Sequence, residues 1–340
     1  MWKLTLLALA LCLLTCTAEE SPSAATTPAA DAEDEFSCMC VPKDECKDDT
    51  VEDQPKPPSG NETNCGPEQV CCFHLIVRTE KTIERHSYYY RDVKGDDVPT
   101  AVAKLGNFPW HAVLFTQDED FLCSGVLVST KHLLTTADCA AAFQGNEASK
   151  LKVRLGVVDR ETTAPSQKDF TVQKVTLHPG FQPPSKGNNL AVLEVSNEVV
   201  FDLYIIRVSL AESEASFEGD KCTLSGWGKH LKRGSLSTTL LQVNVSVLDT
   251  TTCEDLLQKS SLGHSFKVPE GSFCVAGSCQ GDEGGPVVCR GPTQLVLAGV
   301  VSYGDLPCGE QPGVYSYIPK NLDFISQATG LPKEDLTRPL

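Results

Sequence analysis

The stretch Cys279-Gln280-Gly281-Asp282-Glu283-Gly284-Gly285-Pro286 decides how the rest of this chain is interpreted. An apolar run, residues 295–303, follows it closely. Similar short runs, separated by Gly, Pro and Asn turns, extend back to about Ala101; they are residues 110–115, 124–128, 151–158, 190–195 and 240–247. Many short β-rich segments with such turns predict an all-β barrel or sandwich. A helix-like apolar spacing in residues 321–329 predicts one short C-terminal helix.

Length and charge limit the class of protein. The 340 residues can hold one large domain of about 200–250 residues together with smaller appendages. The formal net charge of −16 argues against nucleic acid or an anionic membrane surface as a partner.

The N-terminus has the features of a secretory signal. Lys3 supplies a positive charge, residues 6–14 form an apolar core, and Cys16-Thr17-Ala18 provides a small-residue cleavage site. A membrane anchor is the alternative, but the apolar run is much shorter than the ~20 residues that span a bilayer. We therefore expect residues 1–18 to be a signal peptide and the protein to be extracellular.

The cysteines predict a disulfide framework. Removal of Cys12 and Cys16 with the signal leaves 14 of the 16 cysteines, an even number in an exported chain. Zinc binding is the competing interpretation, but the spacings do not repeat a paired Cys-x-x-Cys pattern. We expect no metal and no other cofactor.

Six of these cysteines lie within residues 38–72, a segment too short to build an adequate core without cross-links. Residues 19–37 before it are acidic and of low complexity, which is typical of a flexible tail. Residues 73–97 after it form a polar linker. Asn61 and Asn244 begin sequons and are candidate N-glycan acceptors.

Residues 38–72 resemble an arthropod clip domain. The pattern is Cys38-Met39-Cys40-Val41-Pro42, followed by Cys46, Cys65 and Cys71-Cys72. Spacing alone allows about 15 pairings of six cysteines. The family pairs first with fifth, second with fourth and third with sixth, which implies the bonds Cys38–Cys71, Cys40–Cys65 and Cys46–Cys72.

Residues 98–330 resemble the chymotrypsin-like serine proteases. The matching segments are Gly106-Asn107-Phe108-Pro109-Trp110, Cys123-Ser124-Gly125-Val126-Leu127, Leu134-Thr135-Thr136-Ala137-Asp138-Cys139, His178-Pro179-Gly180-Phe181, Asn188-Asn189-Leu190-Ala191-Val192-Leu193, Cys222-Thr223-Leu224-Ser225-Gly226-Trp227-Gly228 and Ser302-Tyr303-Gly304. Their order and approximate spacing agree with the family. The resemblance implies a double β-barrel with a short C-terminal helix, followed by a tail, residues 331–340.

The family pattern also implies a set of disulfides in this domain. They are Cys123–Cys139, Cys222–Cys289, Cys253–Cys274 and Cys279–Cys308. Together with the three clip bridges they use every cysteine that follows the signal, so no free thiol is expected.

All three positions of the family's catalytic triad are substituted. Asp138 stands where the resemblance implies the histidine, Asn189 where it implies the aspartate, and Glu283 where it implies the serine. Nucleophile, base and orienting group are therefore missing together. Gly277 occupies the position where trypsin-like members place the aspartate of the specificity pocket. The pattern predicts a protein without protease activity.

Two alternatives remain for the two acids. Asp138 and Glu283 could form a new acid–base pair in one cleft, in which like charges would raise one pKa, or they could hold a cation. Otherwise they are substitutions that followed the loss of catalytic constraint, or a solvated acidic patch.

Activation by cleavage also departs from the family pattern. The expected junction, residues 96–100, has no basic residue, so we expect no new amino terminus to form there and pair with Asp282. Arg91 and Lys94 in the linker are candidate trypsin-type cleavage sites, and cutting them would free the clip domain without switching on catalysis.

The combined architecture resembles the clip-domain serine protease homologues of arthropods. The resemblance implies a secreted haemolymph protein that regulates an extracellular protease cascade of innate immunity, such as prophenoloxidase activation and melanisation. Its implied partners are clip-domain proteases, prophenoloxidase or other cascade proteins, with a homo-oligomer as a further option. An adhesion or developmental scaffold, and a hydrolase that uses Asp138 and Glu283, are the alternatives.

Overall fold

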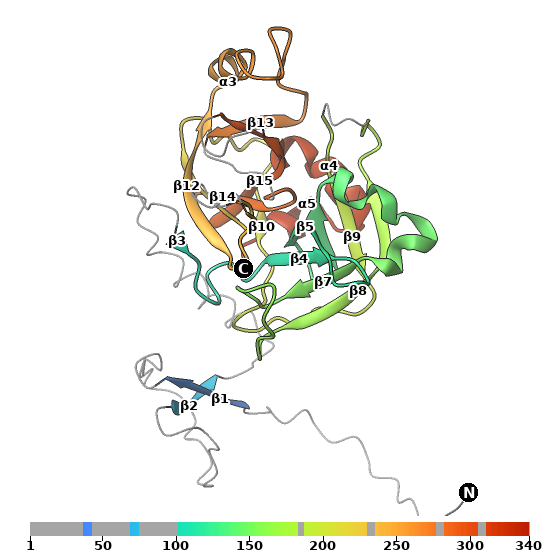
Figure 1. Cartoon of the computed structure of the whole chain (residues 1–340), viewed down its shortest axis with the longest axis vertical. Helices are drawn as coiled ribbons and strands as arrows, with labels where there is room; N and C mark the ends of the chain where they lie inside the picture. Colours follow the sequence, from blue (N-terminus) through green and yellow to red (C-terminus); the bar gives the residue numbers. More distant parts are fainter. Residues whose placement is uncertain are drawn as a thin grey trace, which may run out of the picture. The chain divides into compact units, whose positions relative to one another are not determined.

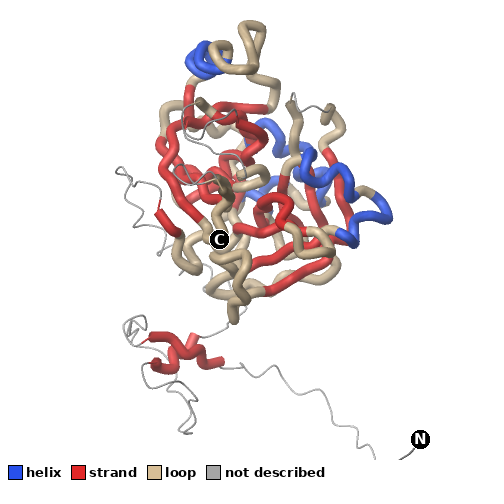
Figure 2. Tube along the Cα trace, in the orientation of Figure 1, coloured by secondary structure: helices blue, strands red, loops and turns tan. Residues whose placement is uncertain are grey.

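The computed structural model describes residues 37–42, 69–74, 101–182, 187–229, 235–276, 282–304 and 311–339. The chain divides into two units, Met1–Leu75 and Ile76–Leu340. Strands are the main regular secondary structure among the described residues of the second unit, with short helices and many loops between them (Figure 2).

The described part of the first unit is a two-stranded antiparallel ribbon. Strand β1 (Ser37–Pro42) pairs with β2 (Gln69–His74), and the register places Cys40 opposite Cys71. The signal peptide, the acidic tail, most of the clip segment and most of the linker lie outside the described residues. The clip domain and its three bridges therefore remain predictions.

The second unit begins with a closed six-stranded barrel (Figure 1, green). Its strands, in order around the barrel, are β4 (His111–Phe115), β5 (Phe121–Leu127), β6 (His132–Thr135), β9 (Ala191–Val195), β8 (Lys168–Leu177) and β7 (Lys152–Leu155). Aliphatic side chains such as Leu114, Leu134 and Leu193 are fully buried in its core. Closure of the barrel pairs every strand on both sides, which leaves no unprotected edge.

The second barrel is built in the same way from later strands. They are β11 (Lys221–Gly226), β12 (Leu241–Leu248), β13 (Ser272–Ala276), β16 (Gly313–Tyr317), β15 (Leu295–Gly304) and β14 (Pro286–Arg290), and β14 pairs back to β11. Two short strands pair with strands of this barrel: β3 (Ala101–Val102) with β12 and β10 (Ser209–Leu210) with β15. The prediction of an all-β double barrel is confirmed.

The helices are short and connect or follow the barrels. They are α2 (Ala137–Ala140), the 3-10 helices η2 (Ala141–Phe143) and η3 (Gly145–Lys150), α3 (Thr250–Leu257), α4 (Ile318–Thr329) and α5 (Lys333–Thr337). Helix α4 confirms the predicted C-terminal helix and ends at Gly330, whose φ of 70° is left-handed.

The C-terminal tail, residues 331–340, contains structure that the sequence pattern did not predict. Helix α5 lies there, and its Leu336 is fully buried in the core of the unit. The carbonyl of Arg338 accepts hydrogen bonds from Arg207 Nη2 at 3.1 Å and Ser209 Oγ at 2.8 Å. Five residues are too few to show helical periodicity, so only these contacts identify the segment as part of the domain.

Three of the predicted disulfides are formed in the structure. They are Cys123–Cys139, Cys222–Cys289 and Cys253–Cys274. The first joins β5 to α2, the second joins β11 to β14, and the third joins α3 to β13. The fourth predicted bond, Cys279–Cys308, lies outside the described residues.

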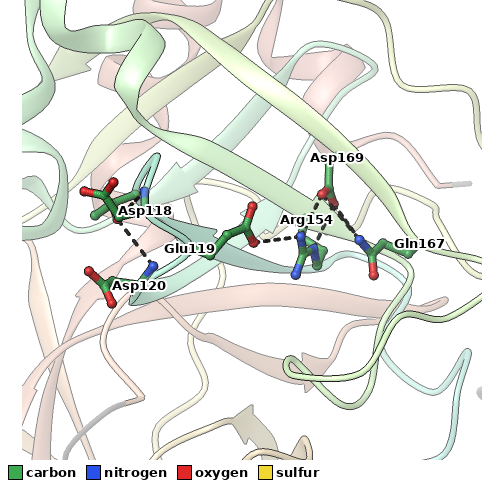
Figure 3. A network of polar contacts seen from close by, with 7 residues as sticks. Asp118, Glu119, Asp120, Arg154, Gln167 and Asp169 are labelled. Atoms are coloured by element: carbon green, nitrogen blue, oxygen red, sulfur yellow. Dashed lines mark hydrogen bonds and ion pairs between the residues drawn. The ribbon is translucent and has the colours of Figure 1, made fainter. Parts of the chain in front are cut away.

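The turn between β4 and β5 is anchored by Arg154 of β7 (Figure 3). Its guanidinium donates to both carboxylate oxygens of Asp169, at 2.9 and 2.8 Å, and to Glu119 Oε2 at 3.1 Å. It also lies over the ring of Phe115, 4.6 Å from the centroid. The hydrogen bond from Arg154 to Asp169 raises the pKa of Arg154. Glu119 itself has a left-handed φ of 64°, and its backbone N–H donates to the carbonyl of Thr116 at 3.1 Å.

A histidine is buried where the two barrels meet. The ring of His111 in β4 stacks edge-on against Trp227, with centroids 4.7 Å apart, and its Nδ1 shares a hydrogen bond with Ser225 Oγ at 2.9 Å. Burial lowers the pKa of His111 from 6.5 to about 3. The imidazole is therefore neutral in the folded protein throughout the range in which an exposed histidine becomes charged.

This burial predicts acid-sensitive folding. Below about pH 6.5 the unfolded chain binds a proton at His111 and the folded chain does not, so the free energy of unfolding falls by up to ~1.4 kcal/mol per pH unit down to about pH 3. Burial also lowers the pKa of His132 and of His178, which adds to the effect. Denaturant unfolding at pH 7 and pH 4 should show a smaller loss in His111→Gln than in the wild type. Equal losses in the two proteins would contradict this account.

Candidate functional site

Asp138 is positioned by the junction between β6 and α2. The chain leaves β6 at Thr135, and Thr136 caps α2 by accepting a hydrogen bond from the backbone N–H of Cys139 at 3.2 Å. The disulfide Cys123–Cys139 fixes this turn to the neighbouring strand β5. Asp138 is the exposed member of a short helix whose other residues are buried, so its carboxylate faces solvent at the rim of the site.

Asn189 forms two hydrogen bonds with Asp138. Its Oδ1 accepts the backbone N–H of Asp138 at 2.9 Å, and its Nδ2 donates to Asp138 Oδ2 at 3.0 Å and to Ser302 Oγ at 2.9 Å. The residue is 1% exposed, and its backbone carbonyl accepts a hydrogen bond from Ser316 Oγ at 2.9 Å. Both amide hydrogens of Asn189 are therefore used, and a carboxylate could not donate either of these bonds.

Glu283 lies on a turn that backbone contacts define. Its carbonyl accepts the N–H of Ser124 at 2.9 Å, and the N–H of Gly284 donates to the carbonyl of Val301 at 2.9 Å. Gly284 has a φ of +81°, and a Cβ there would lie 2.1 Å from the carbonyl oxygen of Ser124. Only glycine fits this position, so the turn keeps its shape whatever side chain precedes it.

Asp282 is buried beside this turn and is 7% exposed. Its Oδ1 accepts the backbone N–H of Gly228 at 2.9 Å. A Cβ at Gly226 or Gly228 would lie 2.0 or 2.4 Å from the same oxygen, so both glycines make room for the carboxylate. The glycines of the segment 226–228 therefore serve the packing of Asp282.

Asp138 and Glu283 line one cleft, as one of the alternatives for the two acids requires. The cleft has a volume of about 380 Å³ and is lined by Leu122, Cys123, Thr136, Asp138, Cys139, Glu283, Ser302 and Tyr303. Burial raises the pKa of Tyr303 to about 12, so its phenol is neutral at physiological pH. Across the described ranges, no group of three or more metal-ligating side chains comes together.

Among the described residues that line the cleft, no hydroxyl is paired with an imidazole base. Ser302 Oγ accepts a hydrogen bond from Asn189, and Thr136 Oγ1 caps α2. No histidine is among the residues that line the described cleft: His111 contacts Trp227, His132 shares a hydrogen bond with Ser129, and His178 stacks on Phe324. A serine or threonine without an adjacent base is a poor nucleophile.

The structure leaves several predicted site residues untested. Gly277, Asn61, Arg91 and Lys94 lie outside the described residues. Asn244 lies in β12, and its Nδ2, which would carry a glycan, is buried without a hydrogen-bond partner among the described residues. This burial argues against Asn244 as an acceptor. Its position inside the apolar run 240–247 was a signal in the sequence that pointed the same way.

Sequence reasoning did not assign Thr136, Leu122, Ser302 or Tyr303 to the site. Ser302 and Tyr303 belong to a motif that marked the family resemblance, so a signal for them was present. Leu122 comes from the strand next to the cleft, and nothing in its sequence context distinguishes it from a core residue.

In the part of the chain that is described, no helix is long and apolar enough to span a membrane.

Comparisons with known proteins agree with this geometry. A family model described as Trypsin matches residues 97–325. Kallikrein-5 of Homo sapiens is 34% identical over 252 residues, which cover 69% of this chain and 79% of that protein. The solved structure of neuropsin, a serine protease expressed in the limbic system of mouse brain, is similar with a TM-score of 0.58 and 29% sequence identity. The match covers 68% of this chain and 98% of the neuropsin chain.

Two insect proteins are also similar. Inactive CLIP domain-containing serine protease A3 of Aedes aegypti is 29% identical over 240 residues, which cover 67% of this chain and 50% of that protein. Serine protease filzig of Drosophila melanogaster is 30% identical over 247 residues, which cover 67% of this chain and 14% of that protein. The matched part therefore spans half or less of either insect relative. Since the family match covers most of the chain and the double barrel underlies it, the chain belongs to the trypsin family.

Proposed function

We propose that this protein is a secreted, catalytically inactive member of its family that regulates an extracellular clip-protease cascade in innate immunity, as in prophenoloxidase activation and melanisation. The observation that carries the proposal is the pairing of Asn189 with Asp138. An amide–carboxylate pair, joined by a hydrogen bond from Asn189 Nδ2 to Asp138 Oδ2 at 3.0 Å, stands where the family places a carboxylate–imidazole pair; the backbone N–H of Asp138 also donates to Asn189 Oδ1 at 2.9 Å.

The chemistry of this pair supports inactivity. A carboxylate is in general a weaker base than an imidazole, and the neutral amide of Asn189 cannot stabilise a positive charge that develops beside it. Glu283 offers no hydroxyl to attack a peptide carbonyl, and a carboxylate is a weak nucleophile towards an amide. Each substitution removes a different part of the mechanism, so none of them compensates for another.

The interactions among the substituted residues also support a changed role. Asn189 donates hydrogen bonds to Asp138 and Ser302, and its backbone carbonyl accepts one from Ser316. The four residues therefore form one hydrogen-bonded group. The turn that carries Glu283 keeps its glycine and its backbone hydrogen bonds. A cleft that is preserved without a nucleophile is suited to binding on a rigid scaffold. One similar protein bears a name that describes it as inactive and as containing a CLIP domain.

The partners we propose are clip-domain proteases, prophenoloxidase or other cascade proteins of haemolymph. The clip segment, residues 38–72, would dock or assemble with them, and the barrels would provide the second surface. Cleavage at Arg91 or Lys94 would separate these two functions. No cofactor is required by this proposal.

Peptidase assays test the proposed inactivity. The secreted protein, before and after limited trypsin treatment with the trypsin then blocked, should release no product from peptide substrates above the buffer rate. Glu283→Gln should give the same result, because Glu283 is not used as a catalyst. Turnover in the wild type that Glu283→Gln abolishes would establish the alternative, a hydrolase that uses Asp138 and Glu283.

A reconstitution experiment tests the cascade role. Purified protein, intact or cut in the linker 73–97, is returned to plasma depleted of it, and phenoloxidase activity is measured. We expect at least one form to change the activity. No change with either form would contradict the role in this cascade and leave the adhesion or developmental scaffold as the better explanation.

A further inference from the structure

We propose that the cleft between Asp138 and Glu283 binds a cationic side chain, an arginine or lysine of a partner protein, with the carboxylate of Asp138 as its charge partner. This inference rests on the proposed non-catalytic function, since it assigns the cleft a ligand that is held and not cut. The site is formed by the substituted triad positions themselves.

The charge of the lining selects a cation. The described lining contains two carboxylates, Asp138 and Glu283, and no lysine, arginine or histidine. Of its hydroxyls, Thr136 Oγ1 and Ser302 Oγ accept hydrogen bonds from Cys139 and Asn189, and the third is the neutral phenol of Tyr303. An anionic ligand would meet like charges, whereas a guanidinium or ammonium brings the donors that carboxylates lack.

Asp138 is oriented for this role before any ligand arrives. Its backbone N–H and its Oδ2 are both tied to Asn189, at 2.9 and 3.0 Å, and a disulfide at Cys139 fixes the next residue. No ion pair of the described residues involves Asp138, although the side chain is exposed at the rim. A fixed carboxylate loses little conformational entropy on binding, which favours affinity.

The walls of the cleft suit the apolar stem of such a side chain. Leu122, the disulfide Cys123–Cys139 and the half-buried ring of Tyr303 provide apolar surface next to the acids. Lysine and arginine bury their methylene stems on apolar surface and keep the charged end at polar groups, and an aromatic ring can also attract a guanidinium. The volume of about 380 Å³ lies at the lower end of the range for ligand pockets, which accommodates one side chain and its backbone.

A metal ion is a poorer match than an organic cation. A hard divalent ion needs about six oxygen ligands at short range, and no cluster of three or more candidate ligands occurs among the described residues. The apolar part of the lining, Leu122 and the disulfide Cys123–Cys139, cannot coordinate a metal ion but can contact the methylene stem of a lysine or arginine. The combination of acid and apolar wall therefore favours a side chain.

The test compares two peptides that differ only in charge. Fluorescein-labelled Gly-Gly-Arg-Gly-Gly and its citrulline counterpart are titrated with the full-length secreted protein, and fluorescence anisotropy gives the two dissociation constants. Citrulline keeps the shape of arginine and removes its charge. We expect the arginine peptide to bind about ten- to a hundredfold more tightly, with an advantage that shrinks as salt is added.

Substitution of the charge partner locates the site. Asp138→Asn preserves shape and can still accept the hydrogen bond from Asn189, so we expect a folded protein in which the arginine peptide binds about as weakly as the citrulline peptide. Asp220→Asn is the matched control, because Asp220 is exposed, lies outside the cleft lining and removes the same charge. It should bind both peptides as the wild type does.

The outcomes separate this inference from the proposed function. Equal binding of the two peptides, or undiminished arginine preference in Asp138→Asn, would overturn the inference and leave inactivity untouched. Mass spectrometry of the peptide after incubation reports on the proposed function instead, since a cleaved peptide would contradict inactivity. Loss of the preference in Asp138→Asn together with an intact peptide supports both.

Discussion

Gly284→Ala should destabilise the barrel unit severely, lowering its free energy of unfolding by more than ~3 kcal/mol or preventing secretion altogether. The added Cβ would lie 2.1 Å from the carbonyl oxygen of Ser124 and 2.5 Å from Thr135 Oγ1. Neither atom can move freely, because Thr135 Oγ1 donates to that same carbonyl at 2.8 Å and Ser124 N–H donates to the carbonyl of Glu283. The clash would therefore disrupt the packing of the turn that carries Glu283 against the first barrel.

Gly263→Ala provides a matched control for this substitution. Gly263 also has a φ of +81°, but a Cβ added there would have no described neighbour within 4 Å. Its replacement adds only the conformational strain of a left-handed alanine, about 1–2 kcal/mol. Denaturant unfolding of the two variants isolates the packing contribution. Equal destabilisation of both would show that the close approach at Gly284 does not hold the turn.

The same contacts give the turn a role in folding that does not depend on the side chain of Glu283. The glycine lies against Ser124 and Thr135, which belong to the first barrel, while Val301 of the second barrel accepts its N–H. The turn is therefore part of the interface between the barrels. Its preservation follows from folding and requires no catalytic role.

Asn189→Asp should cost about 2–4 kcal/mol of stability at pH 7. The change restores the residue that the family resemblance implies, but it places a second carboxylate within about 3 Å of Asp138. It also removes the two N–H groups that donate to Asp138 and Ser302. Because the position is 1% exposed, water cannot readily screen the repulsion.

The pH dependence identifies the cause of this loss. Like charges at this distance favour uptake of one proton by the folded state, which raises the pKa of the pair in the variant above its value in the unfolded chain. The stability difference between variant and wild type should therefore shrink as the pH falls towards 4 and grow as it rises to 7. Comparison at each pH removes the contribution of His111, which both proteins share.

The double variant that combines Asp138→Asn with Asn189→Asp is the control for that prediction. It exchanges the two side chains, so one carboxylate and one amide remain. The amide placed at position 138 can donate to the carboxylate placed at position 189, and most of the lost stability should return. A double-mutant cycle measured by denaturant unfolding gives the coupling. A single substitution that costs less than about 0.5 kcal/mol and shows no pH dependence would mean that the two side chains do not act as a pair.

The apolar pattern of the chain predicts an all-β barrel or sandwich and the helix at α4, because short apolar runs between turns favour strands locally. The double barrel and the disulfides, among them Cys123–Cys139 and Cys222–Cys289, were implied by the family resemblance. Helix α5 could not be predicted in this way, because its stability comes from burying Leu336 and not from a local pattern. The burial of His111 is likewise a consequence of how two barrels meet.

For the site, the motifs of the sequence are enough to predict, through the family resemblance, that Asp138, Asn189 and Glu283 stand at the triad positions, because a motif links residue identity to position. The tertiary structure adds that Asn189 donates to Asp138 and Ser302, that Tyr303 and Leu122 line the cleft, and that Gly284 has no room for a side chain. These features depend on atoms brought within about 3–4 Å by strands far apart in the chain, and such distances are set by packing rather than by local sequence.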